Sequence, residues 1–323
     1  MHRCAADCVR KEGSPKETLK YTSIAELVNT ATERGEAISQ IVLRDQAEQM
    51  DTEPKVLFNK MRDNYHVMQE SIQKGTDPNI RSTSGLTGGD AYKLYSVHKQ
   101  GKSLTGSFIS GAIWRALAVS ELNAAMGRIV AAPTAGSCGI LPAAIVTMQE
   151  EYSLDEYDCV MALFTASAVG MVIGNNASLA GASGGCQAEC GSASAMAAAA
   201  VVELAGGTPA MSGEAVAIAI KNILGLVCDP VAGLVEIPCI KRNAGGVTTA
   251  FMAAEVALAG IASHIPADET ILAMKRIGDT LPATLRETAE GGLAMTPTGQ
   301  KLNTLVFGEN TDAAACSSCR ACR

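Results

Sequence analysis

No charged side chain occurs between Cys159 and Ala188. The continuous apolar part of this stretch, VMALFTASAVGMVIG, is shorter than the roughly 20 residues that a membrane-spanning helix needs. It runs into Asn175, Asn176 and a Gly/Ser-rich stretch. Other parts of the chain must therefore bury it. We predict a core helix enclosed by further helices, and no membrane span.

Helical patterns recur along the chain, and strict alternation of apolar and polar residues is almost absent. The pair Ser23 and Glu26 forms a capping box, and a second helix is predicted with Pro54 in its first turn and Gly75 at its end. Further helices are predicted over 104–130, after the Pro133 loop, and over 158–173, 190–204, 213–226, 246–262 and 268–279. Only 4% of residues are aromatic and many are small, which favours close helix packing. The predicted fold class is mainly α, with one helical domain at 22–308, a polar tail at 1–21 and a flexible Cys-rich tail at 309–323.

Charge and composition exclude several classes of function. The net charge is −7 and no basic stripe is present, so neither nucleic acid nor an anionic membrane is an expected partner. The start, MHRCAADCVRKEG, lacks the apolar run of a secretory signal, so we expect a cytoplasmic protein whose 11 cysteines serve metal binding or catalysis more than disulfides. A zinc site built from histidines is not expected, because no H-x-x-x-H pair occurs among His2, His66, His98 and His264.

The C-terminal tail carries Cys316, Cys319 and Cys322 in a C-x2-C-x2-C pattern, which is typical of metal or iron–sulfur sites. The tail, GENTDAAACSSCRACR, has no apolar content that would fold around a cluster. Three interpretations stay open: a flexible tail whose cysteines have no fixed role, a cysteine that reaches back to a site in the body, and an independent metal site. Cys322 is the candidate tail ligand.

Four central cysteines lie at junctions between loops and helices. Cys186 and Cys190 occur in GGCQAECGSASAMAAAA, and Cys228 and Cys239 bracket CDPVAGLVEIPC. Free backbone N–H groups at such junctions are available to cluster sulfides. Three cysteines from separate loops would leave one iron of a 4Fe–4S cluster without a protein ligand. An open position lets a metal act as a Lewis acid on a substrate.

Two loops of small residues, TSGLTGGDA and PTAGSCG, are candidates for substrate binding. Glycine permits positive φ, so consecutive amides can converge on a carboxylate. A plain tight turn is the alternative interpretation. The candidate substrate-binding residues are Ser84, Thr87, Gly88 and Thr134.

Five phrases together resemble the α chain of the iron–sulfur-dependent bacterial L-serine dehydratases: SGLTGGDAYKL, AAPTAGSCGILPAA, NNASLAGASGGCQAECGSASAMAAAAVVELAGGTP, KNILGLVCDPVAGLVEIPCIKRNA and LRETAEGGLAMTPTG. The resemblance covers most of 22–308. It implies a single helical catalytic domain with Gly/Ser-rich loops around an oxygen-sensitive 4Fe–4S cluster, whose ligands are Cys186, Cys228 and Cys239. The family pattern does not require cysteine at three other positions, which we interpret as small core or near-site residues: Cys138, Cys159 and Cys190.

The resemblance also implies a β portion with a GPSSSHT motif, which this sequence lacks. We therefore expect a separate β chain that forms an αβ heterodimer with this chain. Any catalytic histidine of the β portion would then come from that partner.

The activity that the resemblance implies is deamination of L-serine to pyruvate and ammonia through 2-aminoacrylate, with the open iron acting as Lewis acid on the serine hydroxyl. Lys241 is the in-chain candidate for the base, and a surface or carboxylate-binding lysine is the alternative. No S-x-K-x-R-G-like stretch suggests pyridoxal phosphate. The alternatives are a cluster-dependent lyase that acts on cysteine (a desulfidase), an electron-transfer iron–sulfur protein and a non-catalytic scaffold subunit.

Overall fold

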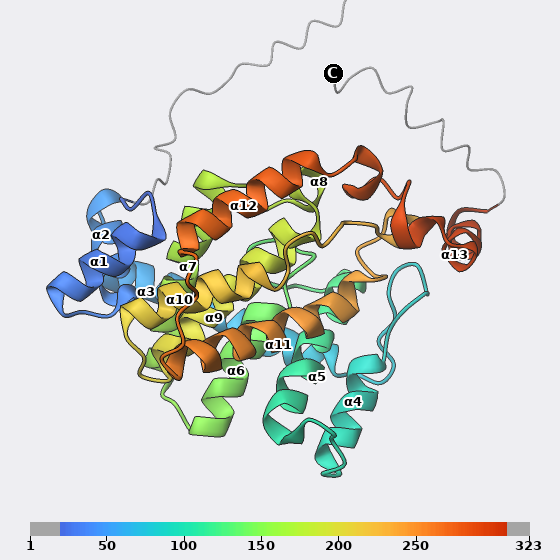
Figure 1. Ribbon diagram of the computed structural model, residues 1–323. Helices are drawn as coiled ribbons and strands as arrows, with labels where there is room; N and C mark the ends of the chain where they lie inside the picture. Colours follow the sequence, from blue (N-terminus) through green and yellow to red (C-terminus); the bar gives the residue numbers. More distant parts are fainter. Residues whose placement is uncertain (1–19, 309–323) are drawn as a thin grey trace, which may run out of the picture.

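Helix α9 (Ser192–Leu204) runs through the middle of the part of the chain that the computed structural model describes, residues 20–308 (Figure 1). Every residue from Ser192 to Val202 is buried. A helix that is apolar on all sides has to be enclosed. Its neighbours are α6 (Ile140–Tyr152), α7 (Glu156–Asn176), α10 (Pro209–Lys221) and α11 (Cys239–Leu258).

The other helices surround this centre. In the amino-terminal half, α1 (Ile24–Arg34) and α2 (Ile38–Gln49) lie on one side, and α3 (Pro54–Gly75), α4 (Asp90–Lys99) and α5 (Gly106–Ala124) follow (Figure 1). The later elements are α8 (Gly181–Gly184), the π-helix η1 (Gln187–Gly191), the 3-10 helices η2 (Val231–Gly233), η3 (Ala283–Leu285) and η4 (Gly292–Met295), α12 (Ala267–Thr280) and α13 (Pro297–Phe307). Within residues 20–308 the single β-type pairing is a parallel bridge between Cys228 and Arg286. The prediction of a mainly α fold is confirmed.

Several predicted helix ends are found in the structure. The Ser23 hydroxyl accepts a 3.0 Å hydrogen bond from the Glu26 backbone N–H and caps α1. Helix α3 begins at Pro54 and ends at Gly75. The sequence did not predict α13, because only Gly299 of that helix is buried and no apolar stripe marks it.

Helix α7 is the one described helix that is long and apolar enough to cross a membrane. However, 72% of its most apolar window is buried inside the protein. It packs against α9, α2 and α3. The burial agrees with the predicted core helix.

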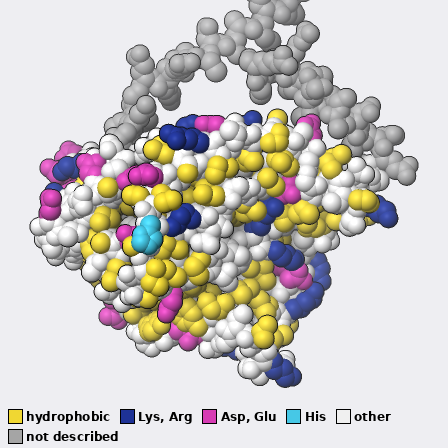
Figure 2. Space-filling view, viewed as in Figure 1, with side chains coloured by type: hydrophobic (Ala, Val, Ile, Leu, Met, Phe, Trp, Pro, Cys, Tyr) yellow, Lys and Arg dark blue, Asp and Glu magenta, His cyan; other side chains and the backbone are white. Residues whose placement is uncertain are grey.

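The face seen in Figure 2 is rich in apolar side chains over α10, α11 and α12, with charged side chains scattered among them. Exposed apolar side chains on α11, α12 and the loop between them include Met252, Ile261, Ile265 and Leu272. Contiguous apolar surface of this kind is typical of a contact with another protein.

Close packing of α3 on α5 depends on Gly75. A Cβ at this position would lie 1.9 Å from the carbonyl oxygen of Ala118. Gly75→Ala is therefore expected to lower the free energy of unfolding by about 1–3 kcal/mol. The matched control is Gly245→Ala in α11, where no atom lies within 4 Å of the added Cβ. This variant is expected to raise the free energy of unfolding by about 0.5–1 kcal/mol, because alanine favours a helix more than glycine does. Urea unfolding midpoints measure both changes, and equal midpoints for the two variants would contradict the packing argument.

Candidate functional site

Four buried thiols come from three separate segments. Cys186 precedes η1 and Cys190 lies within it, Cys228 lies between α10 and η2, and Cys239 is the first residue of α11. None is more than 6% exposed, and all four are free thiols. The sequence therefore places these cysteines at helix junctions, as predicted, and the fold buries them.

The four thiols influence one another electrostatically. The sulfurs of Cys186 and Cys190 are 3.4 Å apart, and the hydrogen bond from Cys190 holds the pKa of the Cys186 thiol below its ordinary value, with the Arg242 guanidinium adding to this. Burial, followed by the charge of Cys186, raises the pKa of Cys228 and raises that of Cys239 to about 12. We call these four residues the cysteine group.

Arg242 is the cation of this group. Its Nη2 atom lies 2.8 Å from Oδ1 of Asp229, and its Nη1 atom donates a 2.9 Å hydrogen bond to the Val227 carbonyl oxygen. The positive charge of Arg242 also helps to lower the pKa of the Cys186 thiol. Because a cation with little access to water needs anionic partners, Arg242 is held to the Cys228 loop by Asp229 and favours negative charge on the Cys186 sulfur.

Thr134 is connected to the cysteine group indirectly, because it hydrogen-bonds to Glu189, the residue before Cys190. The Thr134 hydroxyl donates a short hydrogen bond to the Glu189 carboxylate. That carboxylate packs flat on Gly136, where a Cβ would lie 2.5 Å from Oε1. Burial raises the pKa of Glu189, and the charge of Glu287 adds to the rise. The PTAGSCG loop is therefore part of the same neighbourhood as the cysteines.

Ser84 and Thr87 bind a protein carboxylate. Their hydroxyls donate to the two oxygens of Glu236 at 2.8 and 2.7 Å. Glu236 is 5% exposed and lies three residues before Cys239. These hydrogen bonds fasten the SGLTGGDA loop to the loop that carries Cys239.

The backbone amides of the same loop also have an internal partner. The N–H groups of Gly89, Asp90 and Ala91 converge on the buried carboxylate of Glu121 at 3.1, 2.9 and 3.2 Å. The sequence predicted that amides here converge on a carboxylate, and the structure places a protein side chain in that position. Their role toward substrate stays a prediction.

Thr87, Gly88 and Lys241 line one pocket of about 390 Å³, together with Arg81, Gly85, Leu86, Asp90, Lys93 and Ile237. Lys241 is 60% exposed, and its ammonium lies 2.7 Å from Asp90. Lys93 pairs with the other oxygen of Asp90 at 2.9 Å. Three of the five candidate substrate and base residues therefore lie together in this basic pocket. The other two are not in its lining: Ser84 hydrogen-bonds to Glu236, and Thr134 hydrogen-bonds to Glu189.

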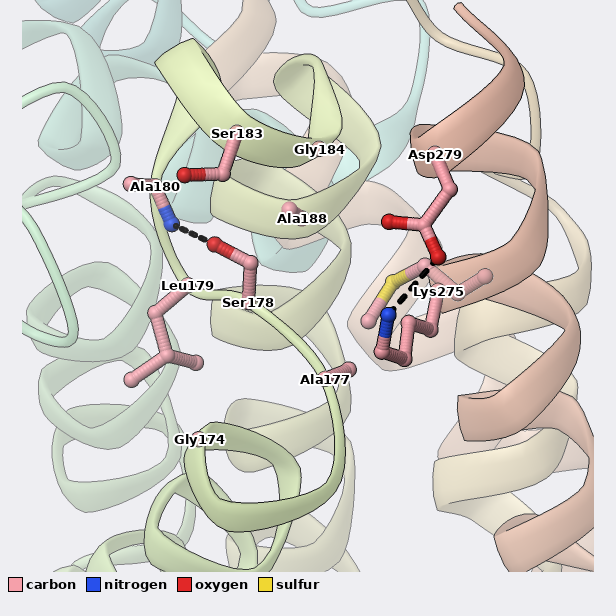
Figure 3. Close-up of a pocket in the computed structure, with 11 residues that line it drawn as sticks. Gly174, Ala177, Ser178, Leu179, Ala180, Ser183, Gly184, Ala188, Lys275 and Asp279 are labelled. Atoms are coloured by element: carbon pink, nitrogen blue, oxygen red, sulfur yellow. Dashed lines mark hydrogen bonds and ion pairs between the residues drawn. The ribbon is translucent and has the colours of Figure 1, made fainter.

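A larger pocket, of about 470 Å³, lies between the end of α7, α8 and α12 (Figure 3). One of its polar side chains and one charged pair are already engaged with neighbours. Ser178 accepts a hydrogen bond from the Ala180 backbone N–H, and Lys275 pairs with Asp279. No cysteine is among its lining residues.

The cysteine group supplies sulfur donors of the kind that bind iron–sulfur clusters. Among residues 20–308, no three His, Cys, Asp or Glu side chains lie close enough to hold one ion. A cluster binds each thiolate at a different iron, so its ligands stand farther apart. A Cβ on Gly181 would lie 2.9 Å from the Cys228 sulfur, so the absent side chain leaves room beside that thiol. Cys186, Cys228 and Cys239 as ligands stay a prediction.

Of the other cysteines, some lie in the core and some lie outside the described residues. Cys138 and Cys159 are fully buried, and burial raises their pKa values to about 12 and about 11. Cys190 belongs to the cysteine group. Cys4, Cys8, Cys316, Cys319 and Cys322 lie outside the described residues.

Sequence reasoning gave no role to four residues that border the cysteine group: Glu189, Asp229, Glu236 and Glu287. Asp229 and Glu236 lie within the CDPVAGLVEIPC phrase, and Glu189 lies within GGCQAEC. Their position beside cysteines was the available signal. Glu287 is far from any cysteine in the sequence, so only the fold reveals it.

Comparison with known proteins identifies the family. The family model described as "Serine dehydratase alpha chain" matches residues 33–294. The "Probable L-serine dehydratase, alpha chain" of Bacillus subtilis (strain 168) is 51% identical over 288 residues, which cover 89% of this chain and 96% of that protein. The "L-serine dehydratase, alpha chain" of Peptoniphilus asaccharolyticus is 45% identical, with 86% and 95% covered. "L-serine dehydratase 2" of Escherichia coli (strain K12) is 36% identical, with 88% of this chain and 64% of that protein covered.

The chain therefore belongs to the serine dehydratase alpha chain family. The family match covers most of the predicted 22–308 domain, whose boundaries stay a prediction. The resemblance deduced from the sequence phrases is confirmed.

Proposed function

We propose that this chain is the α subunit of an L-serine dehydratase, a lyase that deaminates L-serine to pyruvate and ammonia in the cytoplasm. Family membership supports the reaction class. The single observation that carries the proposal is the cysteine group, in which Cys186, Cys228 and Cys239 lie buried around the Arg242 cation.

Cys186, Cys228 and Cys239 would hold a 4Fe–4S cluster. When bound, the cluster supplies a Lewis acid for the serine hydroxyl, which is otherwise a poor leaving group. Arg242 offsets the negative charge of the thiolates, and burial keeps water from them. Pyridoxal phosphate has no role in this proposal.

The basic pocket offers a place for the substrate carboxylate. Lys241 and Lys93 both face Asp90 there, next to Thr87 and Gly88. Charged lysines suit carboxylate binding, the alternative role that the sequence left open for Lys241. Removal of the Cα proton would then fall to Lys241 or to a histidine of a partner chain.

A separate β chain is the proposed partner. Two relatives are named as alpha chains, and the longer Escherichia coli relative extends beyond the region matched here. The exposed apolar side chains on α11 and α12 support a protein contact (Figure 2). We propose an αβ heterodimer.

Anaerobic reconstitution with iron and sulfide, with and without a β chain, tests the proposal. Pyruvate formation from L-serine and from L-cysteine is measured side by side, together with the absorption spectrum of the protein. We expect pyruvate from serine only when both chains and iron are present. Preference for cysteine would indicate a desulfidase, and reversible redox cycling without pyruvate would indicate an electron-transfer protein.

A further inference from the structure

The phrase LRETAEGGLAMTPTG lies against Cys228. The Cys228 backbone N–H donates a 2.9 Å hydrogen bond to the Leu285 carbonyl oxygen, and the Glu287 N–H donates a 2.8 Å bond to the Cys228 carbonyl oxygen. These two bonds form the parallel bridge of the described chain. The backbone of Glu287 is therefore fixed directly beside a proposed cluster ligand.

The Glu287 side chain borders the same space as the Cys228 sulfur. A Cβ on Gly181 would lie 2.9 Å from that sulfur and 3.4 Å from Oε2 of Glu287. The negative charge of Glu287 is among the causes that raise the pKa of Cys228. Within residues 20–308, the exposed Glu287 carboxylate accepts no hydrogen bond and joins no ion pair.

The backbone around Glu287 is held in an unusual conformation. Glu287 has φ +66°, in the left-handed region that disfavours residues other than glycine. The segment is anchored downstream by Asp229, whose Oδ2 accepts a 2.8 Å bond from the Leu293 N–H. A Cβ on Gly292 would lie 2.3 Å from the same oxygen, so this anchor requires glycine. The segment is therefore tied to Cys228 and to the residue after it.

We propose that Glu287 binds the ammonium group of the substrate and so sets specificity for an amino acid. This rests on the proposed function. A 2-amino-3-hydroxy acid brings a hydroxyl to the cysteine group and a positive charge beside it. Glu287 supplies a carboxylate there that has no partner among residues 20–308, whereas Glu189 is already bound by Thr134. Hydrogen bonds between charged groups are among the strongest in proteins.

The experiment uses the reconstituted α chain with its β chain and compares Glu287→Gln with the wild type. L-serine is the substrate, and two competitive inhibitors separate the interactions: L-alanine keeps the ammonium group and lacks the hydroxyl, and L-glycerate keeps the hydroxyl and lacks the ammonium group. We expect KM for L-serine and the inhibition constant of L-alanine to rise roughly 10- to 100-fold. The inhibition constant of L-glycerate is expected to stay within about twofold, because it lacks the group that Glu287 binds.

Matched variants complete the design. Glu290→Gln removes an exposed carboxylate from the same segment and should leave all three constants unchanged. Glu287→Asp keeps the charge on a shorter arm and should recover part of the affinity for L-alanine. Iron content and circular dichroism are measured for each variant, so that a folding defect is seen separately from a binding defect.

The outcomes distinguish the two proposals. If wild-type protein makes no pyruvate from serine, the proposed function fails and the assignment of Glu287 fails with it. If the wild type is active and Glu287→Gln leaves KM and the L-alanine constant unchanged, the assignment of Glu287 alone is overturned. Equal weakening of L-alanine and L-glycerate would also overturn it, because the effect would then be structural.

Discussion

Single replacement of Cys186, Cys228 or Cys239 by serine is expected to abolish iron binding and pyruvate formation. Each thiol is buried and, in the proposed function, would contribute a soft sulfur ligand, and a serine hydroxyl is a poor substitute for a thiolate at iron. A cluster held by three protein ligands has none to spare. The measurements are iron and sulfide content per chain after anaerobic reconstitution, and the rate of pyruvate formation with the β chain.

Cys159→Ser is the matched control for these three variants. Cys159 is fully buried like the others, but it lies in α7 next to Tyr65 and away from the cysteine group. The same chemical change there should leave iron content at the wild-type level, although it lowers stability. Parental activity in a serine variant that holds no iron would refute the cluster mechanism.

Asp229→Ala is expected to lower the free energy of unfolding by about 2–4 kcal/mol, because it leaves the mostly buried Arg242 cation without its carboxylate partner. Asp229 is 3% exposed, and its two oxygens bind Arg242 and the Leu293 N–H, each at 2.8 Å. Denaturant unfolding of the chain measures the change.

Asp229→Asn separates the two roles of this side chain. Asparagine keeps an oxygen that accepts the hydrogen bond from the Leu293 N–H, but it carries no negative charge. The free energy of unfolding is therefore expected to fall by less than in Asp229→Ala. If Asp229→Ala unfolds at the wild-type denaturant concentration, the ion pair contributes nothing to the folded state and the argument fails.

The fold class could be predicted because helical periodicity and capping are local. Ser23 caps α1 by accepting a hydrogen bond from a residue only three positions away. Pro54 and Gly75 mark the two ends of α3 because of their own backbone preferences. Helix α13 shows the limit of this approach. It lies on the protein surface with almost no buried face, so its sequence has no apolar pattern that predicts a helix.

The candidate site could be predicted only in part. Cysteines at helix junctions and the family phrases pointed to segments that the fold brings near one another. The partner of Ser84, however, is Glu236, 152 residues away, and such a contact depends on how distant loops pack. Consecutive glycines correctly indicated converging amides, but composition cannot tell an internal carboxylate such as Glu121 from one on a ligand.

The last described helix, α13, packs mainly on η2 and η4, beside the Cys228 loop, and hardly at all on the central helices. Regions with few buried contacts open at a lower free energy than the whole domain. Local opening of the segment from η3 to α13 would break the backbone hydrogen bonds of Cys228 to Leu285 and Glu287 while the bundle remains folded. We therefore expect the surroundings of this thiol to follow the fluctuations of a peripheral layer, so that a high melting temperature of the bundle does not by itself fix them.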